Sequence, residues 1–139
     1  LGLVITEEFF FAFQLGDGDI VKVSENGVHN VIEADKILGT ETHSLSKAEA
    51  WKKAISLIRK REENKKEPVM YMLSSDGLSN SYKNDEEFKK TCMDYYVLLK
   101  EHGVKAVSGQ LKTWLQETSE MGSGDDITAL FLYEVPQEE

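Results

Sequence analysis

The sequence predicts an α+β fold in which antiparallel strands come first and helices pack outside them. The 139 residues are enough for about one domain. Short apolar runs separated by glycine turns fill the N-terminal third, which is typical of antiparallel strands. Later stretches place apolar residues at helical spacing. The resulting order β-β-β-β-α-β-α-α-β is neither a regular βαβ alternation nor all-β, and it favours antiparallel sheets with helices outside.

The first strands follow one another closely. Tight turns are expected at Gly16-Asp17-Gly18 and at Glu25-Asn26-Gly27, because these residues favour hairpin connections. The pattern therefore predicts a four-stranded antiparallel meander. Its strands are expected at Leu1–Thr6, Phe9–Leu15, Asp19–Ser24 and Val28–Ile32.

A helix is expected to begin at Ser46, because Glu49 three residues later completes a capping-box pattern. Apolar residues follow at helical spacing as far as Ile58. The charged stretch Glu62–Glu67 is then predicted to be an exposed connection that ends at Pro68. The remaining elements are expected to be a buried strand, two helices separated at His102-Gly103, and a closing strand. Their ranges are Val69–Leu73, Asn84–Glu101, Lys105–Thr118 and Ile127–Glu134, followed by a frayed tail at Gln137–Glu139.

Composition argues against several classes of partner. The formal net charge is −9, and the basic residues near Lys60 are interleaved with glutamates, so no nucleic-acid partner is expected. No apolar run reaches the ~18–20 residues of a membrane span, so no membrane partner is expected. Cys92 is the only cysteine, which excludes an intrachain disulfide and agrees with a cytoplasmic location. We expect its thiol to be buried and structural.

Three acidic triplets lie at the edges of apolar strand-like runs. They are Gly16-Asp17-Gly18, Ser75-Asp76-Gly77 and Gly124-Asp125-Asp126. A strand fixes the position of a carboxylate at its end, and a neighbouring glycine lets the chain turn away. Carboxylate oxygens are hard ligands of the kind that Mg²⁺ and Mn²⁺ prefer. The triplets therefore predict one shared metal site, although each aspartate could instead be a turn former or a cap.

Four stretches together resemble the metal-dependent serine/threonine protein phosphatases of type 2C, in their bacterial branch. The resemblance runs through essentially the whole chain and depends on the order and strand context of the four motifs. They are Phe9–Ile20 (FFFAFQLGDGDI), Leu38–Leu45 (LGTETHSL), Tyr71–Tyr82 (YMLSSDGLSNSY) and Gly124–Leu130 (GDDITAL). The resemblance implies a sandwich of two antiparallel sheets between helical layers (α-β-β-α).

The resemblance also implies roles for single residues. Asp76 and Asp125 are similar to two aspartates that bind the second metal of a binuclear Mg²⁺ or Mn²⁺ centre. Asp17 is similar to an aspartate that helps to hold an accessory third metal. Asp126 stands where many members have asparagine and would add negative charge. Asn80 stands where many members have aspartate, which puts a third metal in doubt, because an amide oxygen is a weaker ligand than a carboxylate.

An earlier Asp-Gly-x-Gly motif, which supplies the bridging aspartate in this family, has no counterpart in residues 1–139. The chain therefore resembles the C-terminal half of the family pattern, and we expect it to be inactive alone. A complete member would hydrolyse a phosphorylated protein substrate with a metal-activated water. The half-sandwich also predicts either a missing N-terminal partner segment or self-association through exposed strand faces. These faces are expected at Phe9, Phe11 and Phe13, or at Phe10 and Ala12.

Two alternatives to a phosphatase remain open at the level of sequence. The chain could be a non-catalytic interaction or regulatory domain that keeps a phosphatase-like scaffold. It could also be a small metal-binding α+β domain unrelated to phosphatases. No catalytic nucleophile is expected, because Ser74 and Ser75 lack a partner base and a Gly-x-Ser-x-Gly context.

Overall fold

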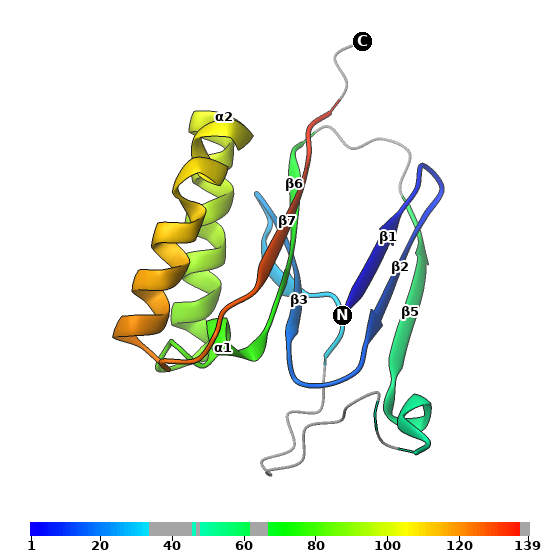
Figure 1. Ribbon diagram of the computed structural model, residues 1–139. Helices are drawn as coiled ribbons and strands as arrows, with labels where there is room; N and C mark the ends of the chain where they lie inside the picture. Colours follow the sequence, from blue (N-terminus) through cyan, green and yellow to red (C-terminus); the bar gives the residue numbers. More distant parts are fainter. Residues whose placement is uncertain (34–45, 47, 62–66, 137–139) are drawn as a thin grey trace.

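The computed structural model describes residues 1–33, 46, 48–61 and 67–136. The expectations for Leu38–Leu45, for 62–66 and for the tail at 137–139 lie outside these residues. Ten elements follow one another along these described residues (Figure 1). They are β1 (Gly2–Ile5), β2 (Phe9–Gln14), β3 (Asp19–Ser24), β4 (Gly27–Asn30), the 3-10 helix η1 (Ala50–Lys53), β5 (Ile55–Lys60), β6 (Val69–Ser74), α1 (Asp76–Ser79), α2 (Asp85–Met121) and β7 (Ala129–Glu134).

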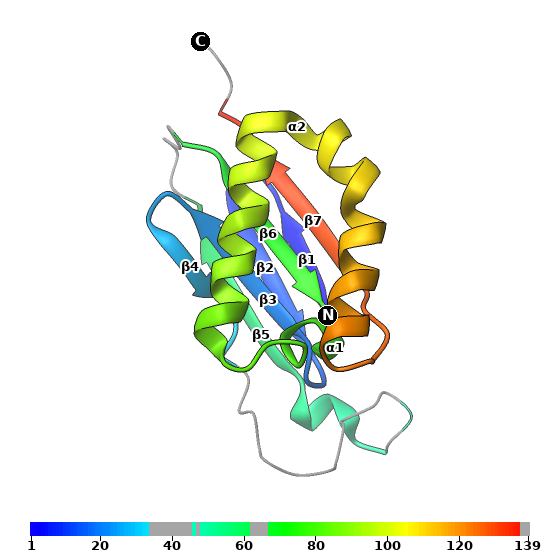
Figure 2. The same cartoon turned by 90° about the vertical axis from the view of Figure 1, so that its left-hand side faces the viewer.

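The strands form two sheets, with the orders β1-β2-β5 and β4-β3-β6-β7. All paired strands are antiparallel. The two sheets face each other, and α2 covers the outer face of the larger one (Figures 1 and 2). The α+β class and the two antiparallel sheets are thus as predicted. Among the described residues, no helix covers the outer face of the smaller sheet, where the resemblance implied a second helical layer (Figure 1).

A small apolar cluster joins the two sheets. Ala12 of β2 and Ile20 of β3 are both buried in it, and Leu57 of β5 and Leu73 of β6 pack against it. The rings of Phe10 and Tyr71 also meet across the two sheets, with centroids 6.3 Å apart. The sheets are therefore held together by side chains from alternate positions of each strand.

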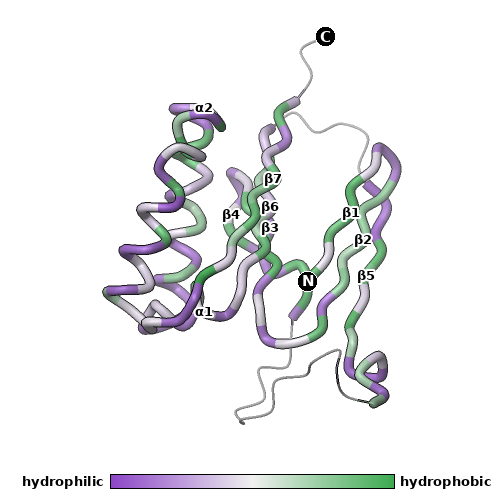
Figure 3. The backbone as a smooth tube through the Cα atoms, viewed as in Figure 1, coloured by the Kyte–Doolittle hydropathy of each residue, from purple (hydrophilic) through white to green (hydrophobic). Residues whose placement is uncertain are grey.

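A larger core lies between the other face of the four-stranded sheet and α2. Hydrophobic residues line the strands, whereas polar and apolar residues alternate along α2 (Figure 3). This pattern is that of a helix with one face toward a sheet. The buried members of this core are Val21, Val23, Met70, Met72, Leu78, Phe88, Cys92, Tyr95, Tyr96, Leu99 and Val107.

The predicted break at His102-Gly103 is present within α2. Two helical segments meet at Gly103, whose φ is 76°. Glycine adopts this backbone conformation without strain. The predicted N-terminus is also correct, because the side chain of Asn84 accepts a hydrogen bond from the backbone N–H of Glu87 at 2.9 Å. None of the described helices is long and apolar enough to cross a bilayer.

The predicted meander is wrong at its centre. Strands β1 and β2 form one hairpin, and β3 and β4 form another, but β2 and β3 belong to different sheets. The turn at Gly16-Asp17-Gly18 therefore links two sheets. The physical reason is that β2 and β3 both have apolar residues that need covering on one face. Stacking them face to face buries Ala12 against Ile20, which side-by-side pairing would not do.

The predicted helix over Ser46–Ile58 is also wrong. Among the described residues of this range only the 3-10 helix η1 forms, and Ile55–Lys60 instead adds the strand β5 to the edge of β2. The β-branched residues Ile55 and Ile58 suit a strand. The open edge of β2 offers backbone hydrogen-bond partners to this segment, in place of the bonds that it would make within a helix. Glu49 has a left-handed φ of 63° and makes no side-chain cap, and Trp51 of η1 is 73% exposed.

Candidate metal centre

The three acidic triplets come to one end of the larger sheet. Strand β6 ends at Ser74, which pairs with Asp19 at the start of β3 and with Ala129 at the start of β7. Asp76 follows the end of β6, and Asp125 precedes β7. The loop that carries Asp17 leads into β3, so strand register alone explains why the triplets approach the same end.

Asp76 is the first residue of the short helix α1 and is half-buried. Asn80, one turn later, donates a side-chain hydrogen bond from Nδ2 to Oδ2 of Asp76 at 3.3 Å. The backbone N–H of Asn80 also bonds to the carbonyl oxygen of Asp76 at 2.8 Å. The amide of Asn80 therefore restrains the Asp76 carboxylate.

The segment with Asp125 packs directly against the residue after Asp76. A Cβ atom placed on Gly77 would lie 2.6 Å from the carbonyl oxygen of Asp126 and 3.2 Å from Cβ of Asp125. Glycine is required here because any side chain would force these two segments apart. The segments of Asp76 and Asp125 are thus in contact, although both Asp125 and Asp126 are exposed to solvent.

Asp17 lies at the same end, on the loop between the two sheets, and is exposed. This loop is fixed in place, because Nε2 of Gln14 donates hydrogen bonds to the carbonyl oxygens of Gly16 and Gly18. A Cβ atom on Gly18 would lie 2.5 Å from the carbonyl oxygen of Ser74, so the loop seats closely on the end of β6. Asp17 is therefore near the other two aspartates in the fold but belongs to a separate loop.

The candidate ligands at this end of the sheet are few. Within the ranges that the structure describes, no three carboxylate, imidazole or thiol groups gather closely enough to hold a metal ion. Asp76 and Asp125 offer hard oxygen ligands that suit Mg²⁺ or Mn²⁺, but such ions take about six ligands. Two carboxylates alone supply fewer ligands than such an ion takes.

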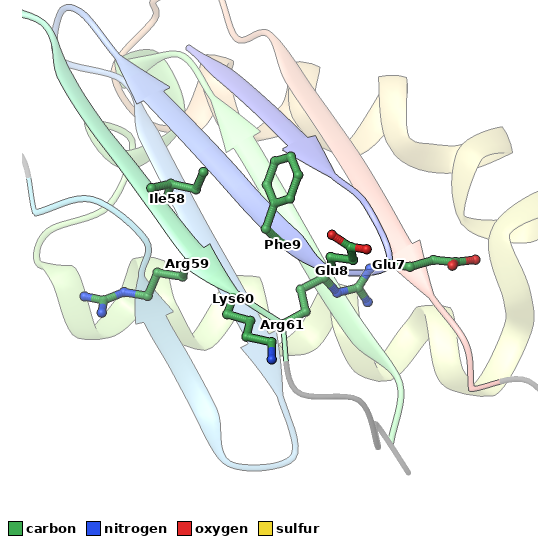
Figure 4. A pocket seen from close by; sticks show the side chains of 7 residues that line it. All are labelled: Glu7, Glu8, Phe9, Ile58, Arg59, Lys60 and Arg61. Carbon is green, nitrogen blue, oxygen red and sulfur yellow. The ribbon is translucent and has the colours of Figure 1, made fainter.

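Two hollows on the surface have different relations to these carboxylates. One of about 580 Å³ lies between the end of α2 and β7 and is lined in part by Leu115, Ser119, Asp125 and Asp126. The other, of about 640 Å³, is lined by Glu7, Glu8, Phe9 and Ile58–Arg61 on the smaller sheet (Figure 4). It includes none of the predicted metal ligands. Any chemistry that depends on Asp125 and Asp126 is therefore better sought at the first hollow, despite its smaller volume.

Ser75, directly after the end of β6, ties these two segments together through backbone groups. The backbone N–H of Ser75 bonds to the carbonyl oxygen of Thr128 at 2.9 Å, and its Oγ accepts from the N–H of Thr128 at 3.0 Å. Ser75 Oγ also donates to the carbonyl oxygen of Asp126 at 3.2 Å. In the sequence, serine and glycine residues cluster around the acidic residues. Such clusters are common in turns, so they do not by themselves indicate these hydrogen bonds.

Comparison with known proteins finds one family. The family model described as Protein phosphatase 2C matches residues 1–116. The matched residues include Asp17 and Asp76 and end before Asp125. No curated protein and no solved structure matches the chain.

Proposed function

The chain belongs to the protein phosphatase 2C family, and we propose that it supplies one side of the metal site of a protein serine/threonine phosphatase. The single observation that carries this proposal is the packing of Gly77 against Asp125 and Asp126, which brings two acidic segments together from distant parts of the chain. The family relation removes the alternative of an unrelated metal-binding domain. The partner we propose is a phosphorylated protein, and the reaction is hydrolysis of its phosphomonoester.

Asp76 and Asp125 would hold a divalent ion, Mg²⁺ or Mn²⁺, with Asp17 in a peripheral role. Such an ion, when bound, lowers the pKa of a coordinated water and neutralises charge on the phosphoryl group. Asn80 restrains the Asp76 carboxylate by its hydrogen bond to Oδ2. Asp126 adds a second negative charge beside Asp125, which favours a cation at this end of the sheet.

The remaining ligands belong, in this proposal, to a segment with the Asp-Gly-x-Gly motif that residues 1–139 lack. The chain would then correspond to the C-terminal half of the pattern in the bacterial branch. The missing segment would also supply the second helical layer of the α-β-β-α sandwich. A cytoplasmic location agrees with the single cysteine, because thiols stay reduced there.

Metal titration tests the proposal directly. The amide signals of Asp76 and Asp125 should broaden in a heteronuclear NMR spectrum as Mn²⁺ is added, because a bound paramagnetic ion relaxes nearby protons. Asp76→Ala and Asp125→Ala should each weaken this broadening strongly. Asp94→Ala removes an exposed carboxylate on α2 and serves as the control. Broadening that neither site variant changes would contradict the proposed ligands.

Turnover gives a second test. The isolated chain should not hydrolyse p-nitrophenyl phosphate with Mn²⁺, because two carboxylates do not hold the two ions that the family reaction uses. Robust turnover that Asp76→Ala abolishes would show that the described residues suffice for catalysis, and it would overturn the proposed partial site.

A non-catalytic regulatory domain is the second candidate. The observation that favours it is the lack of a three-ligand group within the described residues. The gene distinguishes the two functions. An Asp-Gly-x-Gly motif encoded upstream in the same reading frame would support catalysis, whereas a native polypeptide without such a motif would support the regulatory function.

A further inference from the structure

One serine hydroxyl connects the two acidic segments through a pair of hydrogen bonds. Oγ of Ser123 accepts from the backbone N–H of Asp125 at 3.1 Å and donates to the carbonyl oxygen of Gly77 at 3.1 Å. Gly77 directly follows Asp76. A single atom therefore links the backbone beside one predicted ligand to the backbone of the other.

Ser81 closes this arrangement from the other side. Its Oγ donates to the same carbonyl oxygen of Gly77 at 2.7 Å and accepts from the N–H of Ser123 at 3.3 Å. The two hydroxyl oxygens are 3.1 Å apart. Each hydroxyl has one proton, and the Gly77 carbonyl has two lone pairs, so both protons can be donated to it while each oxygen accepts one backbone N–H. Every group in the set is satisfied, which makes the arrangement rigid.

The surrounding backbone leaves little room for another arrangement. A Cβ atom on Gly122 would lie 2.5 Å from Cβ of Ser81, so the loop sits directly on the turn after α1. Gly124 has a φ of 74°, which returns the chain so that the N–H of Asp125 reaches Ser123. From the end of α2, Oγ of Ser119 donates to the carbonyl oxygen of Asp125 at 2.7 Å. Asp125 is thus held at both its N–H and its carbonyl.

We propose that Ser123 is a positioning residue for the metal site, whose hydroxyl fixes Asp125 relative to Asp76 so that both carboxylates serve one cation. The inference rests on the proposed function and adds the residue that aligns its two ligands. Ser123 itself is not a ligand or a nucleophile, because its proton and an oxygen lone pair are already used by backbone groups. Changing a group that orients a metal ligand typically weakens metal binding about 10–100-fold.

The test compares Mn²⁺ and Mg²⁺ affinity among serine variants by NMR titration of the amide signals. Ser123→Ala should weaken binding about 10-fold. Ser123→Thr keeps the hydroxyl and should restore most of the affinity. Ser108→Ala is the matched control, since among the residues that the structure describes its hydroxyl bonds only to the carbonyl oxygen of Lys105 within α2. Urea unfolding of each variant separates a loss of affinity from a loss of fold.

The outcomes distinguish this inference from the proposed function. If the wild-type chain binds metal, Asp76→Ala abolishes binding and Ser123→Ala binds as the wild type does, the positioning role is overturned alone. If the wild-type chain binds no metal at Asp76 and Asp125, the proposed metal site and the positioning role both fail. Should Ser123→Ala unfold, Ser119→Ala releases Asp125 at its carbonyl instead, and unchanged affinity in that variant would overturn the inference.

Discussion

Gly77 packs against the backbone of Asp126 so closely that a Cβ atom at Gly77 would lie 2.6 Å from the Asp126 carbonyl oxygen. The neighbour is backbone, which cannot rotate away as a flexible side chain can. This contact joins α1 to the segment before β7. A larger side chain at Gly77 should therefore increase the distance between the two acidic segments.

Gly77→Ala should therefore destabilise the chain by about 1–3 kcal/mol, the usual cost of forcing extra volume into a packed site. It should also weaken Mn²⁺ binding, because Asp125 would have to move away from Asp76. Urea denaturation measures the first effect and NMR titration the second. A variant as stable as the wild type would show that the two segments separate easily.

Gly109→Ala is the control for this change and has the opposite expectation. Gly109 lies in α2, and apart from its chain neighbours and the helix backbone no atom lies within 4 Å of an added Cβ. Alanine has a higher helix propensity than glycine by about 1 kcal/mol, so this variant should be more stable by up to that amount. Destabilisation at Gly109 would mean that the stability loss at Gly77 cannot be assigned to the contact with Asp126.

Arg61 joins the two sheets at the end opposite the acidic triplets. Its Nη2 lies 2.9 Å from Oε1 of Glu134 on β7, and its Nη1 donates to the carbonyl oxygen of Thr6. The side chains of Arg61 and Glu134 are only 16% and 23% exposed. Arg61→Met keeps the apolar stem and should cost about 2 kcal/mol, between the values for exposed and buried pairs.

The exposed pair Lys52–Glu49 provides the comparison for Arg61. Its side chains are 50% and 66% exposed, and it lies within one turn. Lys52→Met should change the free energy of unfolding by less than about 0.5 kcal/mol. Equal effects of the two substitutions in urea denaturation would argue against a role for Arg61 in joining the sheets.

Sequence patterns predicted the end of β6 well because strand ends are local features. Val69–Leu73 is uniformly apolar, so its end at Ser74 and the position of Asp76 followed directly. The pairing of β3 with β6, in contrast, could not be predicted from the sequence. Pairing with β6 depends on residues that are distant in the sequence, and the glycine turn before β3 suits a hairpin as well as a crossing between sheets.

The strand β5 shows why local propensity was misleading. Its residues have both helical spacing and β-branched side chains, and the open edge of β2 decided between these two states. The contacts of Ser123 were not predictable for a similar reason. They depend on the approach of two loops 42 residues apart, as the separation of Ser81 and Ser123 shows. Such pairings come from tertiary packing, which no local pattern encodes.

Cys92 should be an inert thiol whose burial makes stability fall at high pH. It is 1% exposed, and desolvation, with a smaller contribution from Asp19, raises the pKa of Cys92 to about 12. The folded state binds the proton more tightly than the unfolded chain, whose thiol pKa is about 8.5. The stabilising contribution is therefore complete below about pH 8.5 and is lost as the pH rises toward 12.

Comparison with Cys92→Ala isolates this effect, because buried tyrosines titrate in the same range. The difference in unfolding free energy between wild type and variant should shrink as the pH rises from about 8.5. In addition, the folded wild type should react with Ellman's reagent at pH 8 only as fast as it unfolds. Rapid labelling without denaturant would contradict the buried position of the thiol.

The outer face of the smaller sheet should make the isolated chain associate with a second copy. Val4, Phe11 and Ile58 lie in register across β1, β2 and β5, and Val4 and Ile58 are 51% and 66% exposed. An apolar row of this kind favours association. A two-fold axis along β2 would place Val4 of one copy over Ile58 of the other. It would also bring Glu8 near Lys60, so that charges of opposite sign meet at the rim.

Three strands offer a small area, so the dimer should be weak and depend on concentration. Sedimentation velocity should show an increase in mean mass with concentration for the wild type. Ile58→Lys should abolish this increase, because it places a charge in the centre of the apolar row. Val104→Lys, at a 57% exposed position on α2, should leave it unchanged. A monomer at every concentration would mean that this face does not pair with itself. Loss of association in both lysine variants would point to net charge as the cause.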